Sequence, residues 1–229
     1  MCGIIGFLGI KNAYKTIFDG LVQLQNRGYD SAGIVIIEEN KFENNKYAST
    51  ETDTALNQLS KLEYNSNIGI GHTRWATHGP KTDFNSHPHY SYNKMFTLVH
   101  NGIIENFKEL REMLLEKGIE SISQTDTEII VNLIAMFYEE TKSVVESIEK
   151  TISLMTGTWG IAVLFINEPN RIYCTRHGSP LLIGIDENMT MIASEQSGFC
   201  NIFNKYIVVN NNDICMLEYN EENEKVIIN

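Results

Sequence analysis

The chain has 229 residues and a formal net charge of −11, from 29 acidic and 18 basic side chains. This length suits one α/β domain, and the acidic balance argues against nucleic acid and anionic membranes as partners. The N-terminus lacks a signal-peptide pattern, no apolar run reaches a membrane-spanning length, and the four cysteines form no CxxC pair. We therefore expect a cytoplasmic chain with reduced thiols, without a metal site or a cofactor.

The first third of the chain predicts two strands, one helix and a polar excursion. Residues 3–9 form an apolar run of strand length, and residues 11–25 place apolar side chains on one helical face. Gly28 stands where glycine commonly ends a helix. Residues 33–37 are β-branched and predict a second strand, whereas the polar residues 38–67 predict a hairpin end and then irregular chain with a short helix.

The rest of the chain predicts helices followed by many strands. Residues 68–75 and 95–100 indicate strands, and the 17 residues 76–92 between them form a loop long enough to act as a lid. Helices are expected at 107–117, 129–138 and 143–155. Further strands are expected at 159–166, 171–175, 181–185, 189–193, 207–209, 214–219 and 226–228. This order favours two layered sheets with helices outside.

The second residue is a cysteine followed by a glycine. Removal of Met1 would leave Cys2 as the N-terminal residue, with a thiol and a free α-amine on one residue. An α-amine with a pKa near ~7.7–8.0 can accept the thiol proton, and the thiolate is a nucleophile for acyl transfer. The alternative is a buried structural cysteine.

An amidase that acts on an amino acid needs three further groups. Asn101 and the adjacent Gly102 N–H are candidate donors to the oxyanion, Arg74 is a candidate partner for a carboxylate, and Asp126 is a candidate partner for an ammonium. Simpler interpretations exist for each. Asn-Gly is a common turn, Arg74 suits a surface position, and Asp126 lies in the capping-box pattern Thr125-Asp126-Thr127-Glu128.

Six motifs occur in an order that resembles a known family. They are CGIIG at 2–6, RGYDSAG at 27–33, HTRWATHG at 72–79, HPH at 87–89, HNGIIEN at 100–106 and TDTE at 125–128. Together they resemble the class II, N-terminal-nucleophile glutamine amidotransferases, on the branch of the glucosamine-6-phosphate synthases (glutamine–fructose-6-phosphate aminotransferases, isomerizing). The family fold is α+β, a four-layer αββα sandwich of the N-terminal-nucleophile hydrolase type, here spanning residues 2–229.

The resemblance implies a role for each matching residue. Cys2 would attack the side-chain amide of L-glutamine and form a glutamyl thioester, with Asn101 and Gly102 as the oxyanion hole. Arg74, with Thr77 and His78, would bind the α-carboxylate, and Asp126 would bind the α-ammonium. The supporting residues implied by the family are Arg27 beside the N-terminal residue, Trp75 at the ammonia exit, and His87. No metal and no cofactor are implied.

The resemblance also implies a partner and leaves alternatives open. The synthases carry a second, sugar-isomerising domain that receives the ammonia, and we expect that domain to be absent from these residues. Departures from the family pattern, including Ser194-Glu195-Gln196, affect domain contacts rather than the nucleophile. The chain could instead be a catalytically silent glutamine-binding regulatory module or the glutaminase half of another amidotransferase.

Several residues also have plain structural interpretations. Tyr29 and Trp75 suit a hydrophobic core, and a metal site at His87, His89 and His100 is disfavoured because their spacing fits no standard pattern. The three remaining cysteines lie in apolar, strand-like surroundings and are expected to be inert core residues: Cys174, Cys200 and Cys215.

Overall fold

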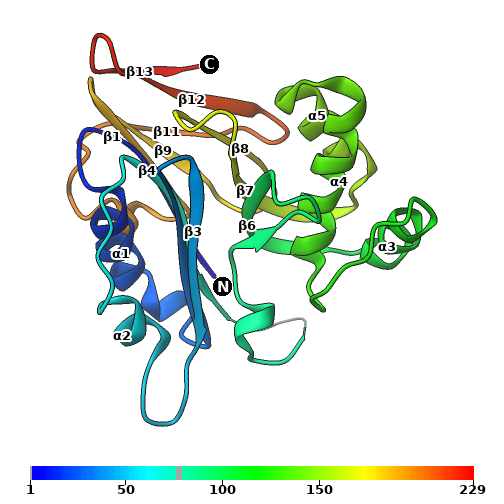
Figure 1. The fold of residues 1–229 in the computed structure, drawn as a ribbon. Coiled ribbons are helices and arrows are strands. Elements are labelled where there is room, and N and C mark those ends of the chain that lie inside the picture. The colour runs from blue at the N-terminus through cyan, green and yellow to red at the C-terminus, as the bar shows by residue number, and fades with distance from the viewer. Residues whose placement is uncertain (1, 76–78) are drawn as a thin grey trace.

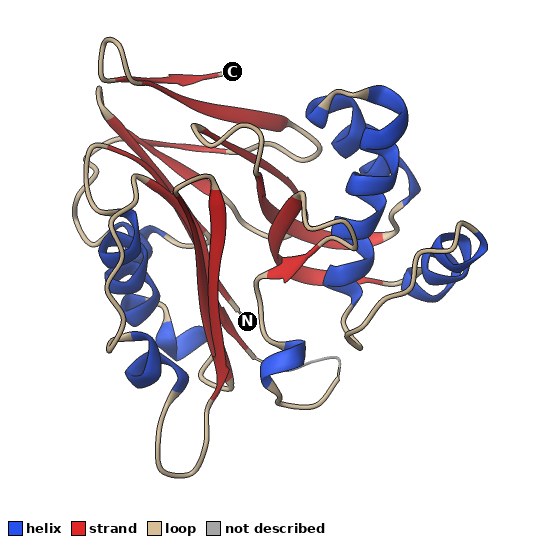
Figure 2. Ribbon diagram, viewed as in Figure 1, coloured by secondary structure: helices blue, strands red, loops and turns tan. Residues whose placement is uncertain are grey.

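The computed structural model describes residues 2–75 and 79–229, which form two antiparallel sheets packed face to face with helices outside them (Figures 1 and 2). The first sheet has the order β11 (Tyr206–Val208), β9 (Leu182–Ile185), β10 (Met189–Ala193), β1 (Gly3–Gly9), β4 (Ile68–Arg74), β2 (Ser31–Glu38) and β3 (Lys41–Ala48). The second has the order β13 (Lys225–Ile228), β12 (Ile214–Asn220), β8 (Arg171–His177), β7 (Gly157–Phe165), β6 (Phe96–Ile104) and β5 (His89–Tyr90).

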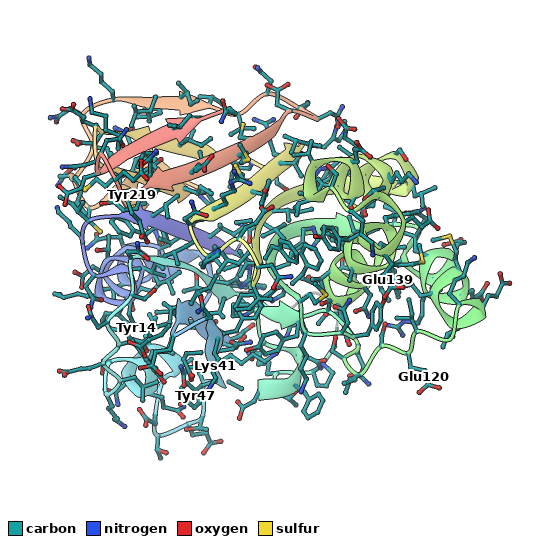
Figure 3. The ribbon with its side chains drawn as sticks, turned by 45° about the horizontal axis from the view of Figure 1, so that its top comes forward. Tyr14, Lys41, Tyr47, Glu120, Glu139 and Tyr219 are labelled. Atoms are coloured by element: carbon teal, nitrogen blue, oxygen red, sulfur yellow. The ribbon has the colours of Figure 1, made fainter. Side chains whose placement is uncertain are left out.

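Helices cover the outer face of each sheet, as Figure 1 shows. The first sheet carries α1 (Ala13–Gln23) and α2 (Ala55–Leu59), which are tied together because the Tyr14 hydroxyl donates to the Leu59 carbonyl at 2.9 Å (Tyr14 is labelled in Figure 3). On the second sheet lie α4 (Asp126–Thr141) and α5 (Val144–Leu154), and α3 (Phe107–Glu116) packs against α4. The predicted four-layer αββα sandwich is confirmed.

The strand β1 contributes to two apolar layers at once. Ile4 and Leu8 belong to the cluster between the sheets, whereas Ile5 and Phe7 belong to the cluster beneath α1. Successive side chains of a strand point to opposite faces, so an unbroken apolar run belongs to a sheet that is covered on both sides. Cys2, which comes directly before β1, is even-numbered like Ile4 and Leu8. The same alternation therefore directs its side chain toward the space between the sheets.

The helix α4 begins at Asp126, three residues before the predicted start. Its N-cap is Thr125, whose hydroxyl oxygen accepts the Glu128 N–H at 3.4 Å, as the capping-box pattern predicts. The Glu128 carboxylate turns instead to the preceding loop and accepts the N–H groups of Ile122 and Ser123. The start of α4 is therefore held from both directions, and the first turn carries a fixed carboxylate.

The prediction for the polar residues 38–67 is partly wrong. They contain a full strand, β3, which pairs with β2 through a two-residue turn at Glu39 and Asn40, both with positive φ. β3 is an edge strand whose side chains are partly exposed, so polar residues are tolerated and no apolar alternation marks it. The predicted short helix is confirmed as α2, and the other predicted strands and helices are confirmed with ends shifted by a few residues. The segment predicted as a loop at 76–92 contains the short strand β5, which was not predicted.

Two local interpretations are corrected. Asn101 and Gly102 are not a turn, because β6 continues to Ile104 and both residues pair with β7. Gly28 follows a short 3-10 turn (Gln25–Arg27) with an extended backbone, and a Cβ there would lie 2.6 Å from the Arg74 carbonyl carbon. A glycine at position 28 therefore allows the backbone to pass close to the end of β4. Within the described residues, no helix is long and apolar enough to cross a membrane.

Candidate active site

The start of β1 lies beside the end of β4 and the second half of β6. Gly3 pairs with Thr73 of β4, and the Asn101 side-chain amide donates to the Cys2 carbonyl at 2.9 Å. These contacts join segments separated by roughly 70 and 100 positions in the sequence. A pocket opens at this junction, lined by Cys2, Arg74, Trp75, His87, His100, Gly102, Thr125, Asp126 and Thr127.

The Cys2 thiol is held against the end of β4. The Trp75 backbone N–H donates to the Cys2 Sγ at 3.2 Å, and the thiol lies 3.6 Å from the Trp75 carbonyl oxygen. Burial raises the pKa of the thiol above its ordinary value, although the Trp75 N–H and the cations of Arg74 and Arg27 act in the opposite direction. The thiol is therefore protonated at neutral pH, and nucleophilic attack requires a base.

Gly102 brings backbone to the edge of the pocket in a conformation that only glycine adopts readily. Its φ is +136°, and a Cβ at this position would lie 2.0 Å from the Thr158 carbonyl oxygen and 2.9 Å from the His100 Nε2. No side chain fits there. Of the predicted oxyanion pair, Gly102 lines the pocket, and Asn101 contacts it through the hydrogen bond of its amide to the Cys2 carbonyl.

A buried cation and a buried carboxylate line the same pocket. Arg74, at the end of β4, is 4% exposed, and Asp126 begins α4 with its Oδ2 accepting the Ile104 N–H at 2.9 Å. Burial lowers the pKa of Arg74, and the nearby Cys2 and Asp126 groups partly restore it. Arg74 is therefore not a surface arginine, whereas Asp126 lies in the capped first turn of α4, whose N-cap is Thr125.

Two of the predicted supporting residues, Arg27 and Trp75, are partly exposed. Arg27 forms an ion pair with Glu195, which stands in the departure from the family pattern, and its charge lowers the thiol pKa of Cys2. Trp75 packs edge-on against Tyr29 with ring centroids 5.5 Å apart, and the two residues are 46% and 62% exposed. The core interpretation of these aromatics is therefore wrong, and they form an exposed pair at the mouth of the pocket.

Two buried histidines form a wall beside the start of α4: His87, which lines the pocket, and His89, which lies in β5. The His87 Nε2 lies 2.6 Å from the Thr127 Oγ1, and the His89 Nε2 lies 3.1 Å from the Thr125 Oγ1. Their partners are thus hydroxyls of the α4 start, and no metal-binding group of three His, Cys, Asp or Glu side chains occurs among residues 2–75 and 79–229. The predicted binding residues Thr77 and His78 lie outside the described residues.

We predict that acid lowers the free energy of unfolding through three buried histidines, His72, His87 and His89. Burial lowers the pKa of His72, His87 and His89, that of His72 to about 3. The unfolded chain takes up these protons near pH ~6.5 while the folded chain does not, so the stability is complete above that pH and falls below it. Each histidine contributes a slope of about 1.4 kcal/mol per pH unit, measurable by urea unfolding at pH 7.5 and 5.5.

Two variants sharpen this measurement. His89→Gln removes one of the three buried imidazoles whose pKa is lowered and is expected to flatten the slope. His177→Gln alters a histidine at the end of β8 that is partly exposed and lies outside this wall, and it serves as the control for the substitution itself. Equal urea midpoints at the two pH values would contradict the prediction.

Sequence reasoning did not single out His72, His100 or Thr127 as individual site residues. His100 and Thr127 line the pocket, with the His100 Nδ1 3.1 Å from the Thr127 Oγ1. His72 lies on the same face of β4 as Arg74, two positions before it. Strand periodicity was the available signal, because residues two apart on a strand share a face.

The remaining cysteines and cavities lie away from this pocket. Cys174 is buried between the sheets opposite Cys215, as predicted, but Cys215 and Cys200 are only partly buried, so their core interpretation is partly wrong. A larger cavity of about 620 Å³ lies between α1 and the chain around Tyr64, and no cysteine lines it. The pocket at Cys2 therefore combines a nucleophile with opposite charges.

Fold and site together define a class. Two facing antiparallel sheets between helical layers, with a cysteine at the start of a central strand, are the arrangement of N-terminal-nucleophile hydrolases. A family model described as a glutamine amidotransferase domain matches residues 72–201. The chain therefore belongs to the glutamine amidotransferase domain family.

Curated relatives agree with this assignment. The glutamine–fructose-6-phosphate aminotransferase (isomerizing) of Clostridium acetobutylicum is 39% identical, across 99% of this chain and 38% of the relative. The enzyme of the same name from Clostridium perfringens is 42% identical across 85% of this chain and 32% of the relative. That from Staphylococcus aureus is 38% identical across 96% and 36%. The chain thus spans about a third of the length of these relatives.

Solved structures agree with the fold. The glutamine phosphoribosylpyrophosphate amidotransferase from B. subtilis, complexed with ADP and GMP, superimposes with a TM-score of 0.77 and 25% identity, covering 100% of this chain and 49% of that one. A structure described as the allosteric regulatory enzyme of purine biosynthesis gives a TM-score of 0.79 and 26% identity, covering 100% and 48%.

Proposed function

We propose that this chain hydrolyses L-glutamine to L-glutamate and ammonia through a glutamyl thioester on Cys2. The observation that carries the proposal is one pocket lined by Cys2, Gly102, Arg74 and Asp126, with the Asn101 amide hydrogen-bonded to the Cys2 carbonyl beside it. Membership of the glutamine amidotransferase domain family supports the same reaction.

The reaction proceeds in two acyl transfers once Met1 has been removed. The free α-amine of Cys2 takes the thiol proton, directly or through a water, and Sγ attacks the side-chain carbonyl carbon of glutamine. The resulting oxyanion is stabilised by the N–H groups of Asn101 and Gly102. The protonated amine returns its proton to the departing nitrogen, so ammonia leaves and the thioester remains. Water then attacks the thioester, releasing glutamate and restoring the thiol.

The charges of the pocket select an α-amino acid. Arg74 offers a planar fork that matches the α-carboxylate, and Asp126 faces the pocket with a carboxylate for the α-ammonium. Because both groups are buried, water screens these contacts weakly. Thr77 and His78 are proposed to assist Arg74, as in the family, and Trp75 to border the path along which ammonia leaves.

We predict that Arg74→Lys raises the KM for glutamine. A lysine keeps the charge but loses one of the two parallel hydrogen bonds, and a charge-assisted bond of about 1.5–3 kcal/mol corresponds to a roughly 10- to 100-fold effect. Steady-state kinetics of glutamate release give the KM. Arg111→Lys on α3, a position outside the pocket, is the matched control and should keep the wild-type KM. An unchanged KM in Arg74→Lys would remove Arg74 from substrate binding.

The ammonia acceptor forms a further part of the proposal. The relatives are named glutamine–fructose-6-phosphate aminotransferases, and this chain matches about a third of their length. We infer that residues 2–229 act as a type-2 amidotransferase domain whose ammonia passes to a sugar-isomerising domain or subunit, for glucosamine-6-phosphate synthesis from fructose-6-phosphate. The acidic surface and the absence of a membrane-spanning helix in the described part of the chain fit a cytoplasmic setting.

The proposal is tested by assaying glutamine hydrolysis alongside intact mass. We expect equal amounts of glutamate and ammonia, a chain that lacks Met1, and one adduct on Cys2 after treatment with a glutamine-like electrophile. Glutamine binding without turnover, on a chain that retains Met1, would instead identify a silent glutamine-binding module.

A further inference from the structure

His72 occupies the layer between the sheets, directly behind the Asn101 amide. It lies on β4 and is fully buried. Its Nε2 lies 3.0 Å from the Asn101 Oδ1 and 3.1 Å from the His100 carbonyl oxygen. Its ring does not line the reactive pocket, so any effect on the reaction passes through another residue.

Two backbone carbonyls determine how these side chains are oriented. A carbonyl oxygen can only accept, so the His72 nitrogen facing His100 must carry a hydrogen. That hydrogen can be shared only with an acceptor, which places the Asn101 Oδ1 toward His72. At the other end the Cys2 carbonyl also only accepts, which places the Asn101 Nδ2 toward Cys2. The hydrogen-bond chain from His100 through His72 and Asn101 to Cys2 admits one orientation of the amide.

The surroundings keep His72 in this single form. Burial lowers the pKa of His72 to about 3, with further lowering by the charges of His100 and Arg74. Its ring packs against His87 with centroids 4.2 Å apart. The Nδ1 has no hydrogen-bond partner among the described residues, as suits an unprotonated ring nitrogen. The ring therefore stays neutral, with its hydrogen on Nε2, throughout the working pH range.

We propose that His72 is a positioning residue that holds the Asn101 amide with its N–H groups toward the reacting carbonyl. The inference rests on the proposed glutaminase function. The Asn101 nitrogen carries two hydrogens, and the Cys2 carbonyl uses one, which leaves the other for the substrate oxyanion. If the amide turned over, its oxygen would face both the Cys2 carbonyl and the oxyanion, and repulsion would replace stabilisation.

Two substitutions test this role. His72→Met keeps an apolar side chain of similar size but removes the donor, and we expect a roughly 10- to 100-fold lower kcat with the KM for glutamine changed less than about 3-fold. His72→Gln places an amide N–H near the position of Nε2 and is expected to recover most of the lost kcat. A wild-type kcat in His72→Met would overturn the proposal.

Two further measurements separate positioning from a general loss of structure. Alkylation of the Cys2 thiol by iodoacetamide forms no oxyanion, so its rate should be the same in the wild type and His72→Met. In a double-mutant cycle, His72→Met should add little to the kcat loss of Asn101→Ala, because both act on one group. Alkylation that falls as far as turnover, or additive losses in the cycle, would show a structural role instead.

An observable independent of turnover distinguishes failure of this inference from failure of the proposed function. The side-chain amide resonances of Asn101, identified by their loss in Asn101→Ala, should shift in His72→Met and return toward the wild-type position in His72→Gln. If the wild-type chain hydrolyses no glutamine but the Asn101 resonances still shift in His72→Met, the positioning contact is supported and the glutaminase proposal is refuted. Normal wild-type turnover with unshifted resonances in His72→Met would refute the positioning contact alone.

Discussion

Replacing Cys2 with alanine is expected to lower the kcat for glutamine hydrolysis by at least ~10⁴-fold, because removal of an attacking nucleophile leaves only binding and oxyanion stabilisation. The Cys2 side chain is only partly buried and its thiol contacts the Trp75 backbone, so the variant should remain folded. Release of glutamate and ammonia measures the effect, and thermal unfolding verifies the fold.

A matched cysteine variant completes this experiment. Cys200→Ala removes a partly buried thiol that lies outside the pocket, and should leave the kcat within about 2-fold of the wild type. Substantial glutamine turnover in Cys2→Ala would exclude the thioester route. Full activity in a wild-type chain whose intact mass still includes Met1 would also exclude the proposed mechanism. The α-nitrogen of Cys2 would then be part of a peptide bond and could not act as the base.

The second large effect is expected at Asn101. Asn101→Ala should lower the kcat by ~10²–10³-fold with little change in KM, because a donor aimed at a developing oxyanion acts mainly in the transition state. Steady-state kinetics separate the two constants. A raised KM with an unchanged kcat would mean that Asn101 binds the ground state instead, and the oxyanion assignment would be wrong.

A buried asparagine elsewhere provides the control. The Asn132 Oδ1 on α4 accepts the Tyr92 N–H at 2.8 Å, and the residue is fully buried outside the pocket. Asn132→Ala leaves that N–H without its partner, so we expect a loss of about 1–3 kcal/mol of folding stability. Its kcat should stay near the wild-type value. The two variants therefore distinguish loss of a buried hydrogen bond from loss of an oxyanion donor.

Much of the fold could be predicted because its signals are local. The apolar run of β1 and the capping-box pattern before α4 depend on neighbouring residues alone, and both predictions are confirmed. β3 was missed for the converse reason. β3 is an edge strand with polar side chains that is stabilised by pairing with β2. No pattern within the segment itself predicts that pairing.

The candidate site was predicted more completely than residue types alone would allow, because the order of the motifs resembles a family. Taken singly, Asn101-Gly102 suited a turn and Arg74 suited the surface. The structure corrects both, since β7 pairs with Asn101 and the sheets bury Arg74. The exposure of Trp75 excludes the core interpretation that an aromatic side chain by itself favours.

The sequence by itself determined the layer architecture, the capped start of α4 and the chemical groups that the site contains. The capped start of α4 follows from side-chain type and spacing over a few residues, the layer architecture from the order of the predicted elements, and the groups of the site from motifs whose order resembles a family. Only the tertiary structure decided which groups meet: the Cys2 carbonyl with the Asn101 amide, and His72 behind that amide. The physical reason is that a hydrogen bond across about 100 positions depends on how two sheets stack, and that stacking results from packing of the whole apolar layer between them.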